Sequence, residues 1–275
     1  MMSIVQIALK EDLDDRGDVT SLSTVPVAKT GKATIISKAE GIIAGVDIVA
    51  KVFQEVDSGI KIKANVTDGQ KVSPGDNVID ISGSLRGILT GERTALNFLC
   101  RLSGIASLTS QFVELVKHTG VRILDTRKTT PGLRQLEKYA VKIGGGHNHR
   151  IGLYDMVLIK ENHITAAGGI RQSVESCRDY LKKQNLNLKI EVETRNMLEV
   201  QEALDMQVDR IMLDNMSVQQ IREAVLLVNK KAELEISGGV NLENIVEYAG
   251  TGVDFISIGA LTHSASALDF SLLVK

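Results

Sequence analysis

A strand end crowded with polar side chains lies in the stretch Val121-Arg122-Ile123-Leu124-Asp125-Thr126-Arg127-Lys128-Thr129-Thr130-Pro131-Gly132-Leu133-Arg134. Its first four residues are mostly apolar and β-branched, which predicts a short buried strand. An acid, two bases and three hydroxyls follow at once, and Pro131-Gly132 predicts a turn. Packing a core does not require so many polar groups at one strand end. The stretch therefore predicts a place where an anion is held.

Five further strands are predicted in the second half of the chain, and each ends on polar or glycine residues. Most of the intervening segments are long enough for a helix, so the pattern predicts parallel βα units arranged as in a barrel. Chemistry in such barrels sits at the carboxyl ends of the strands. These strand ends are Lys160 after 156–159, Glu193 after 188–192, Asp214 after 210–213, Ser237-Gly238-Gly239 after 233–236, and Gly259-Ala260 after 254–258.

The first ninety residues show a different pattern. Residues 60–66 alternate with period two, and glycine and proline turns follow, which predicts an α+β, sandwich-like domain with an antiparallel sheet. Helical periodicity then begins near residue 89. We place the domain boundary in this helical region, giving an N-terminal domain over 1–105 and a barrel over 106–265. The tail 266–275 is apolar at several positions and is predicted to pack on the first domain.

Composition limits the classes of partner. The chain has 275 residues, 43% of them hydrophobic, with a net charge of −2, 3% aromatics and no Trp. These values predict a soluble globular protein and argue against nucleic acid as a partner. No apolar run is long enough for a membrane span, and the N-terminus has no signal-peptide pattern. Cys100 and Cys177 are too few for a disulfide framework, so we expect packed thiols and a cytoplasmic protein.

Arg127 and Lys128 are the leading candidates for binding an anion. A guanidinium can bind a carboxylate or phosphate through two hydrogen bonds, and the neighbouring lysine adds a mobile charge. Thr126 lies beside them; the alternative is a solvated strand end. The Gly144-Gly145-Gly146 run allows a close backbone approach to a ligand, and His149-Arg150 follow it. A metal held by His147 and His149, or a plain flexible loop, are the alternatives there.

Glu193 and Asp214 end successive strands, so we expect them to be neighbours at the barrel mouth. Two carboxylates with room for water suit Mg²⁺ bound together with a phosphate. Salt bridges to the basic cluster, or a general acid–base pair, remain alternatives. Ser237-Gly238-Gly239 and Gly259-Ala260 are predicted to hold a phosphate with backbone N–H groups. Arg93, outside the barrel, is by sequence alone a surface arginine at a helix start.

Together these segments resemble the quinolinate phosphoribosyltransferase family along nearly the whole chain. The early segments that match are Ala8-Leu9-Lys10-Glu11-Asp12 and Gly17-Asp18-Val19-Thr20-Ser21. The motifs that carry the resemblance are 91–97 (Gly-Glu-Arg-Thr-Ala-Leu-Asn), 125–134, Asn148-His149-Arg150, 158–163 (Leu-Ile-Lys-Glu-Asn-His), Glu191-Val192-Glu193, Ser237-Gly238-Gly239, and 258–263 (Ile-Gly-Ala-Leu-Thr-His).

The resemblance implies an N-terminal sandwich domain followed by an open parallel α/β barrel. It implies that quinolinate and phosphoribosyl pyrophosphate (PRPP) are converted with Mg²⁺ into nicotinate mononucleotide, pyrophosphate and carbon dioxide, as in NAD biosynthesis. It also implies a homodimer, or a higher oligomer, in which Arg93 reaches the active site of the partner. That implication overturns the surface interpretation of Arg93.

The same resemblance assigns expected roles to the site residues. Lys128, Glu193 and Asp214 are expected to be catalytic, with Glu193 and Asp214 also near Mg²⁺. The remaining residues are expected to bind the two anionic substrates: Arg93, Thr126, Arg127, His149, Arg150, Lys160, Ser237, Gly238, Gly239, Ile258, Gly259, Ala260 and His263. The rival hypotheses are a nicotinate phosphoribosyltransferase-like enzyme, a paralogue associated with molybdate transport, and a binding module that senses a phosphorylated metabolite.

Overall fold

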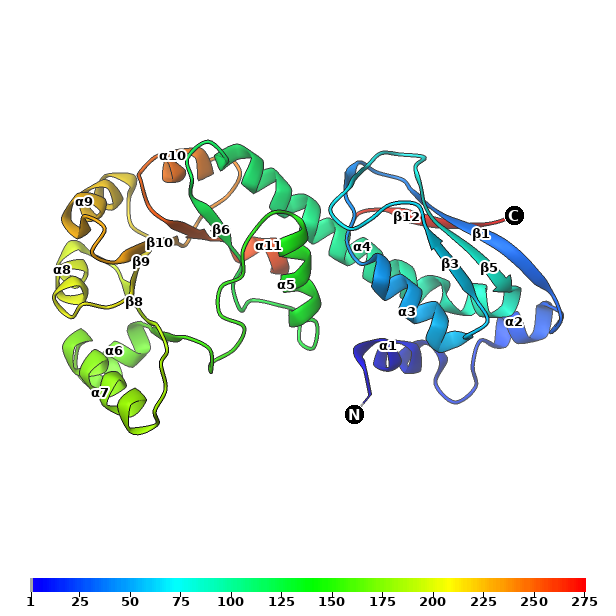
Figure 1. The fold of residues 1–275 in the computed structure, drawn as a ribbon, viewed down its shortest axis with the longest axis horizontal. Coiled ribbons are helices and arrows are strands. Elements are labelled where there is room, and N and C mark those ends of the chain that lie inside the picture. The colour runs from blue at the N-terminus through cyan, green and yellow to red at the C-terminus, as the bar shows by residue number, and fades with distance from the viewer. Residues whose placement is uncertain (1) are drawn as a thin grey trace. The chain divides into compact units, whose positions relative to one another are not determined.

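The computed structural model describes residues 2–275, which form two compact units (Figure 1). Of these residues, the first unit holds 2–110, 129–145 and 262–275, and the second holds 111–128 and 146–261. The units are therefore not two successive pieces of the chain. The sequence-based boundary near residue 105 stays a prediction.

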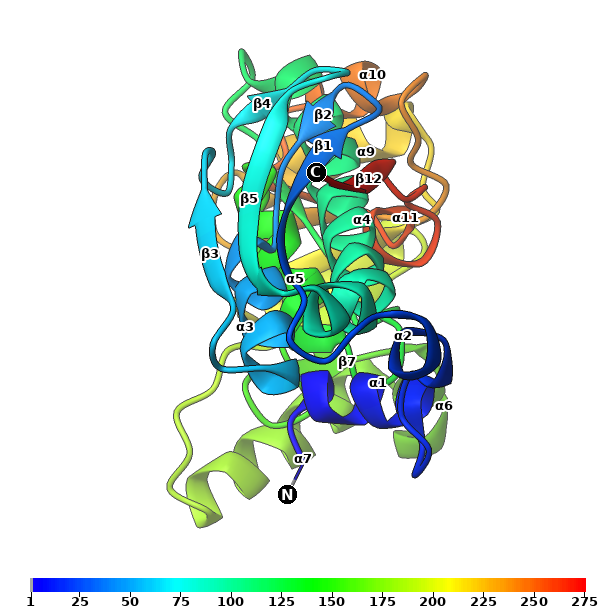
Figure 2. The same cartoon turned by 90° about the vertical axis from the view of Figure 1, so that its right-hand side faces the viewer.

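The first unit is built on an antiparallel sheet in the order β12-β1-β5-β3 (Figure 2). Ala33 and Ile35 of β1 pack in one core with Val49 and Phe53 of α3 and Leu96 of α4. The elements of this unit are α1 (Ile4–Leu13), α2 (Val19–Thr24), β1 (Thr30–Ser37), β2 (Gly41–Ile42), α3 (Val46–Val56), β3 (Lys61–Ala64), β4 (Lys71–Val72), β5 (Asn77–Ser84), α4 (Leu85–Val116, which ends in the second unit), α5 (Arg134–Ile143), α11 (Ala260–His263, which begins in the second unit) and β12 (Phe270–Val274).

The second unit contains a six-stranded parallel sheet in the order β6-β11-β10-β9-β8-β7. Helices alternate with its strands, as the sequence predicted. Among the described residues β6 and β7 do not pair with each other, so the barrel is open, which confirms the predicted fold class. Its elements are β6 (Arg122–Leu124), β7 (Val157–Ile159), α6 (Glu161–Ala167), α7 (Ile170–Lys183), β8 (Ile190–Thr194), α8 (Met197–Asp205), β9 (Arg210–Asp214), α9 (Val218–Val228), β10 (Glu233–Ser237), α10 (Ile245–Ala249) and β11 (Phe255–Ser257).

Local sequence explains where several of these helices begin. Ser3 and Ser217 cap α1 and α9, and each forms a capping box with a glutamine three residues later. Asn196 caps α8 by accepting a hydrogen bond from the Glu199 N–H at 3.0 Å. Because the caps of α8 and α9 fix where these helices start, they also fix the length of the loops that follow β8 and β9 at the barrel mouth. No helix within residues 2–275 is both long and apolar enough to cross a membrane.

Candidate active site

A cavity of about 350 Å³ opens at the carboxyl ends of the barrel strands. All of its lining residues belong to the second unit. A larger cavity, of about 780 Å³, lies in the first unit between α1, α2 and α3, and it contains none of the predicted site residues. The barrel cavity is lined by Thr126, Arg127, Lys128, His149, Arg150, Leu158, Lys160, Glu193, Met212, Asp214, Glu235, Ser237 and Ser257.

The barrel cavity brings together most of the side chains that the sequence singled out. The predicted glycines follow strands β10 and β11, and Ile258 is buried, with its N–H bonded to the Leu124 carbonyl at 2.9 Å. Arg93 and His263 lie on the first unit, exposed on α4 and α11. His163 accepts a hydrogen bond from the Lys160 N–H at 3.0 Å and so belongs to the start of α6.

Main-chain hydrogen bonds bring His149 to the cavity. The segment 146–149 runs beside β6, because the His147 N–H donates to the Ile123 carbonyl at 2.8 Å and the Asp125 N–H donates to the His147 carbonyl at 3.1 Å. The buried Asp125 carboxylate then accepts the His149 N–H at 2.9 Å. Asp125 therefore orders the loop that carries His149 and Arg150.

The glycine run before this loop has a packing role. A Cβ on Gly144 would lie 2.3 Å from the carbonyl oxygen of Ala106 in α4, so only glycine allows the end of α5 to pack there. Gly145 follows with φ of 87°, in the left-handed region. Packing against α4 therefore explains why residue 144 is a glycine, whether or not the run approaches a ligand.

Two guanidiniums lie close together on the cationic side of the cavity. Arg127 Nε is buried and has no hydrogen-bond acceptor among residues 2–275. Burial and the charge of Arg127 both lower the pKa of Arg150. Lys160 Nζ is 3.8 Å from Glu193, on the same cavity. Two neighbouring guanidiniums, one with an orphaned N–H, form a site suited to a multiply charged anion.

Glu193 and Asp214 come from the neighbouring parallel strands β8 and β9 and line the same cavity. Glu193 Oε1 accepts the Glu161 N–H at 3.4 Å, and the Asp214 carboxylate accepts from the Asn215 side chain at 2.9 Å. Both carboxylates therefore keep free oxygen lone pairs beside the cationic groups. Such a pair fits Mg²⁺, which takes few protein ligands and completes its shell with water and substrate phosphates.

The glycine turn after β10 is tied to Asp214 through Asn215. Gly238 has φ of 95°, and a Cβ there would lie 2.2 Å from Asn215 Oδ1. The Asn215 N–H donates to the Ser237 carbonyl at 2.9 Å. The turn can therefore come close to Asn215 only because Gly238 has no side chain.

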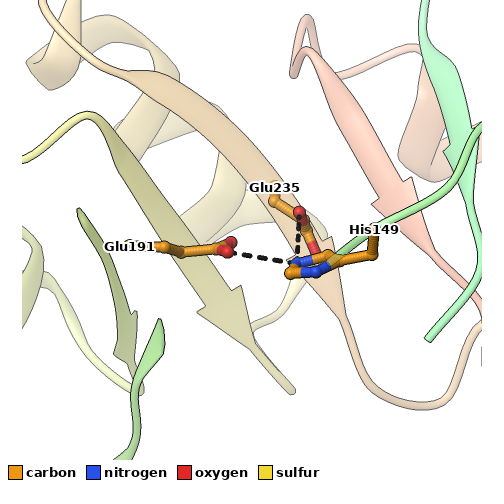
Figure 3. Close-up of side chains that lie close together, drawn as sticks. All are labelled: His149, Glu191 and Glu235. Carbon is orange, nitrogen blue, oxygen red and sulfur yellow. Dashed lines mark ion pairs between the residues drawn. The ribbon is translucent and has the colours of Figure 1, made fainter. Parts of the chain in front are cut away.

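Two buried glutamates beneath the cavity were missed by the sequence interpretation. Glu191 in β8 and Glu235 in β10 are fully buried, and their carboxylates lie 3.1 and 3.4 Å from His149 Nε2 (Figure 3). Each precedes a predicted site residue by two positions, Glu193 and Ser237 respectively, so period-two alternation could have placed them on the same inward face. Leu158, Met212 and Ser257 also line the cavity and were not singled out.

Comparison with known proteins places this architecture in one family. The sequence matches the family model described as "Quinolinate phosphoribosyl transferase, C-terminal domain" over residues 105–273. It also matches the corresponding N-terminal domain over residues 18–103. The chain belongs to the quinolinate phosphoribosyltransferase family.

Relatives within the quinolinate phosphoribosyltransferase family cover the chain almost end to end. It is 44% identical over 289 aligned positions to quinolinate phosphoribosyltransferase [decarboxylating] 1 of Nicotiana glauca, covering 100% of this chain and 82% of that protein. It is 41% identical to the carboxylating nicotinate-nucleotide pyrophosphorylase of Mycobacterium leprae, covering 98% and 95%. The solved nicotinate-nucleotide pyrophosphorylase of Francisella tularensis superposes with a TM-score of 0.93 at 42% identity, covering 98% and 94%.

Proposed function

We propose that this chain transfers the phosphoribosyl group of PRPP to the ring nitrogen of quinolinate and releases pyrophosphate and carbon dioxide. The observation that carries the proposal is the cationic cavity, in which Arg127 Nε is buried without an acceptor beside Arg150. Quinolinate has two carboxylates, and PRPP has a phosphate and a pyrophosphate. Both substrates therefore need the charge that this cavity offers, and the names of the relatives agree with that chemistry.

Quinolinate is held by the cationic side of the cavity in this proposal. Arg127, His149, Arg150 and Lys160 bind its two carboxylates, and Leu158 and Met212 provide apolar surface for the ring. Arginine suits this role because its fixed fork bonds a carboxylate at two points. Holding the ring nitrogen toward the ribose makes the reaction effectively unimolecular, which is a large part of what an enzyme can contribute.

In this proposal PRPP is held by residues that follow strands β6, β10 and β11. Lys128, Ser237 and the backbone N–H groups after β10 and β11 bind its phosphates, where Gly238 and Gly239 have positive φ. Glu193 and Asp214 would also hold Mg²⁺, which neutralises the leaving pyrophosphate. As the ring nitrogen bonds to the anomeric carbon and pyrophosphate leaves, positive charge develops on the ribose. The carboxylates of Glu193 and Asp214 stabilise that charge electrostatically.

Decarboxylation follows from the new bond. The ring nitrogen becomes cationic once it carries the ribose, so the carboxylate on the adjacent carbon can leave as carbon dioxide while its electron pair remains on the ring. A proton then replaces the carboxylate and gives nicotinate mononucleotide. Positioning and charge neutralisation are sufficient for this sequence, and no covalent bond to the protein is formed. A trapped covalent adduct with the enzyme would contradict this mechanism.

The proposal includes an oligomer and a compartment. We infer a homodimer in which Arg93, exposed on α4 of the first unit, serves the active site of the partner subunit. His263, exposed on α11, is proposed to bind substrate as well. The free thiols of Cys100 and Cys177 suit a reducing cytoplasm.

Sedimentation of mixed Arg93→Ala and Lys128→Ala subunits would report the oligomer, and recovery of activity on mixing would support the shared site.

The reaction is tested by measuring pyrophosphate and carbon dioxide from PRPP and Mg²⁺, with quinolinate and nicotinate in parallel reactions. We expect equal amounts of both products from quinolinate and neither from nicotinate. Pyrophosphate from nicotinate without carbon dioxide would assign the chain to the non-decarboxylating class. Binding of PRPP without turnover of either acid, in a folded protein, would favour a sensor or the transport-associated paralogue.

A further inference from the structure

The Nε2 atom of His149 faces two carboxylates inside the barrel. Glu191 Oε2 lies 3.1 Å away, from β8, and Glu235 Oε2 lies 3.4 Å away, from β10 (Figure 3). Both glutamates are 0% exposed, and Glu235 lines the cavity together with the imidazole. Neither glutamate is needed to pack an apolar core, and burying a carboxylate is costly unless it has a charged partner. Arg210 partners Glu235, and His149 is in contact with both carboxylates.

The other nitrogen of the ring is also engaged. His149 Nδ1 accepts the Arg150 N–H at 2.8 Å, so in this arrangement the ring proton lies on Nε2, between the two carboxylates. The hydrogen bond at Nδ1 orients the ring, and Nε2 then lies at ion-pair distance from both carboxylates. The Nδ1 edge, next to the Arg150 main chain, is the edge of the ring that does not face the two glutamates.

The charges beneath the cavity favour a cation at His149. Arg210 of β9 donates to Glu235 at 2.9 Å and to Glu233 at 3.1 Å, so its single charge is shared. Burial lowers the pKa of His149, but Glu191 and Glu235 outweigh it and raise the pKa to about 9. A second proton on Nδ1 would displace the Arg150 N–H. A substrate carboxylate that accepts one hydrogen bond from His149 Nδ1–H and another from the Arg150 N–H would stabilise this protonated form.

We propose that Glu191 and Glu235 are positioning residues that hold the Nε2–H of His149 inside the barrel, so that the Nδ1 edge of a cationic ring meets one substrate carboxylate. The proposal rests on the proposed function and deepens it, because it explains how the site recognises a second carboxylate. The charged groups that face His149 from the surrounding elements are Asp125 after β6, Arg150, Glu191 in β8, Arg210 in β9 through Glu235, and Glu235 in β10.

A metal ion is the competing occupant of this cluster. One ligand atom from each of His149, Glu191 and Glu235 lies within 4.8 Å of the others, which would allow three-point coordination. However, Arg210 already lies 2.9 Å from Glu235. A guanidinium in contact with a ligating carboxylate repels a divalent cation and has satisfied part of the negative charge. The proton on Nε2 therefore explains the cluster better than a metal does.

The test compares Glu191→Gln and Glu235→Gln with the matched control Glu233→Gln. Glu233 bonds Arg210 in the same network but does not contact His149. The protonation and pKa of the His149 ring are measured by ¹⁵N NMR, with His149→Asn used to assign its signals. The KM values for quinolinate and PRPP are measured on the same preparations. Glu191→Asp and Glu235→Asp, which keep the charge, replace any amide variant that does not fold.

We expect the pKa of His149 to fall by about one unit or more in each amide variant and to be unchanged in Glu233→Gln. The KM for quinolinate should rise about tenfold while the KM for PRPP changes little, because the effect acts on one substrate. An unchanged His149 pKa, an equal rise in both KM values, or a stoichiometric Zn²⁺ that removes the Nε2 proton would overturn the proposal. If quinolinate is not a substrate but the pKa still falls, the proposed function fails and the positioning role stands.

Discussion

Asn215 donates a hydrogen bond from its side-chain nitrogen to the carboxylate of Asp214 at 2.9 Å, from a left-handed backbone with φ of 52°. Removing it in Asn215→Ala should leave Asp214 free to rotate. A hydrogen bond to a charged group contributes about 1.5–3 kcal/mol, so we expect kcat/KM for PRPP to fall by roughly tenfold or more. Steady-state kinetics would measure this. Asn229→Ala removes another left-handed asparagine, at the end of α9, and should leave kinetics unchanged.

Gly238→Ala should disturb the same contact from the other side. The new Cβ would meet Asn215 Oδ1 at 2.2 Å, and the backbone at φ of 95° disfavours any side chain. We expect a stability loss of about 1–2 kcal/mol from the left-handed backbone, together with weaker PRPP binding. Gly75→Ala, in the first unit, is the matched control, since φ is 94° but no atom lies within 4 Å of its Cβ. Equal loss of PRPP affinity in both variants, measured by calorimetry, would argue against a role for the Asn215 contact.

Stability should decrease as the pH rises from about 6.5 to about 9. Although burial lowers the pKa of His149, its glutamate partners raise it to about 9, so the folded state binds more protons than the unfolded state in this window. The contribution is fully present below the unfolded pKa and is lost as pH passes the folded pKa. Burial and the charge of Glu235 also raise the pKa of Glu191. This second shift likewise makes the folded protein less stable as the pH rises, but at lower pH than the shift of His149.

Urea unfolding at pH 6 and pH 9 would measure this slope in the native protein and in His149→Gln. We expect the native protein to lose on the order of 2 kcal/mol more than the variant between these pH values. An equal loss of unfolding free energy in both proteins would mean that Nδ1 keeps its hydrogen bond from the Arg150 N–H throughout and that the ring stays neutral.

Glu137→Gln should destabilise the first unit. The Glu137 side chain is 0% exposed and accepts from Arg101 at 2.9 Å and from the Thr130 N–H at 3.1 Å. Arg101 also donates to the carbonyls of Thr262 and Ala265, so the variant leaves a partly buried guanidinium with one charge uncompensated. We expect a loss of about 2–3 kcal/mol in the free energy of unfolding. The exposed pair Lys117–Glu114 offers a comparison, and Glu114→Gln should produce no measurable change in the melting temperature.

Much of the barrel could be predicted from local sequence. Each of the six predicted strands is present, and the sheet order makes Glu193 and Asp214 neighbours, as their positions at successive strand ends implied. Parallel strands align their carboxyl ends by geometry alone. For that reason the amino-acid sequence alone was enough to assign Thr126, Arg127 and Lys160 to one cavity.

The buried part of the site was harder to predict, for a physical reason. Alternation within β8 and β10 could place Glu191 and Glu235 on the inward face, but not beside His149, which comes from a separate loop. Their burial depends on residues more than forty positions apart in the chain, which periodicity within one strand does not report. The packing of Gly144 could not be predicted for a similar reason, because its neighbour Ala106 lies on a different helix.

The last strand of the chain has a consequence for biosynthesis. β12 forms the edge of the first unit's sheet and pairs with β1 from Ala33 to Ser37, so the sheet joins a strand that precedes the barrel sequence to one that follows it. A ribosome must therefore release the entire barrel sequence before this sheet can be completed. Until then β1 has an open edge, which is a template for pairing with other chains. Nascent or truncated proteins that end before Phe270 should therefore depend on chaperones more than the finished protein does.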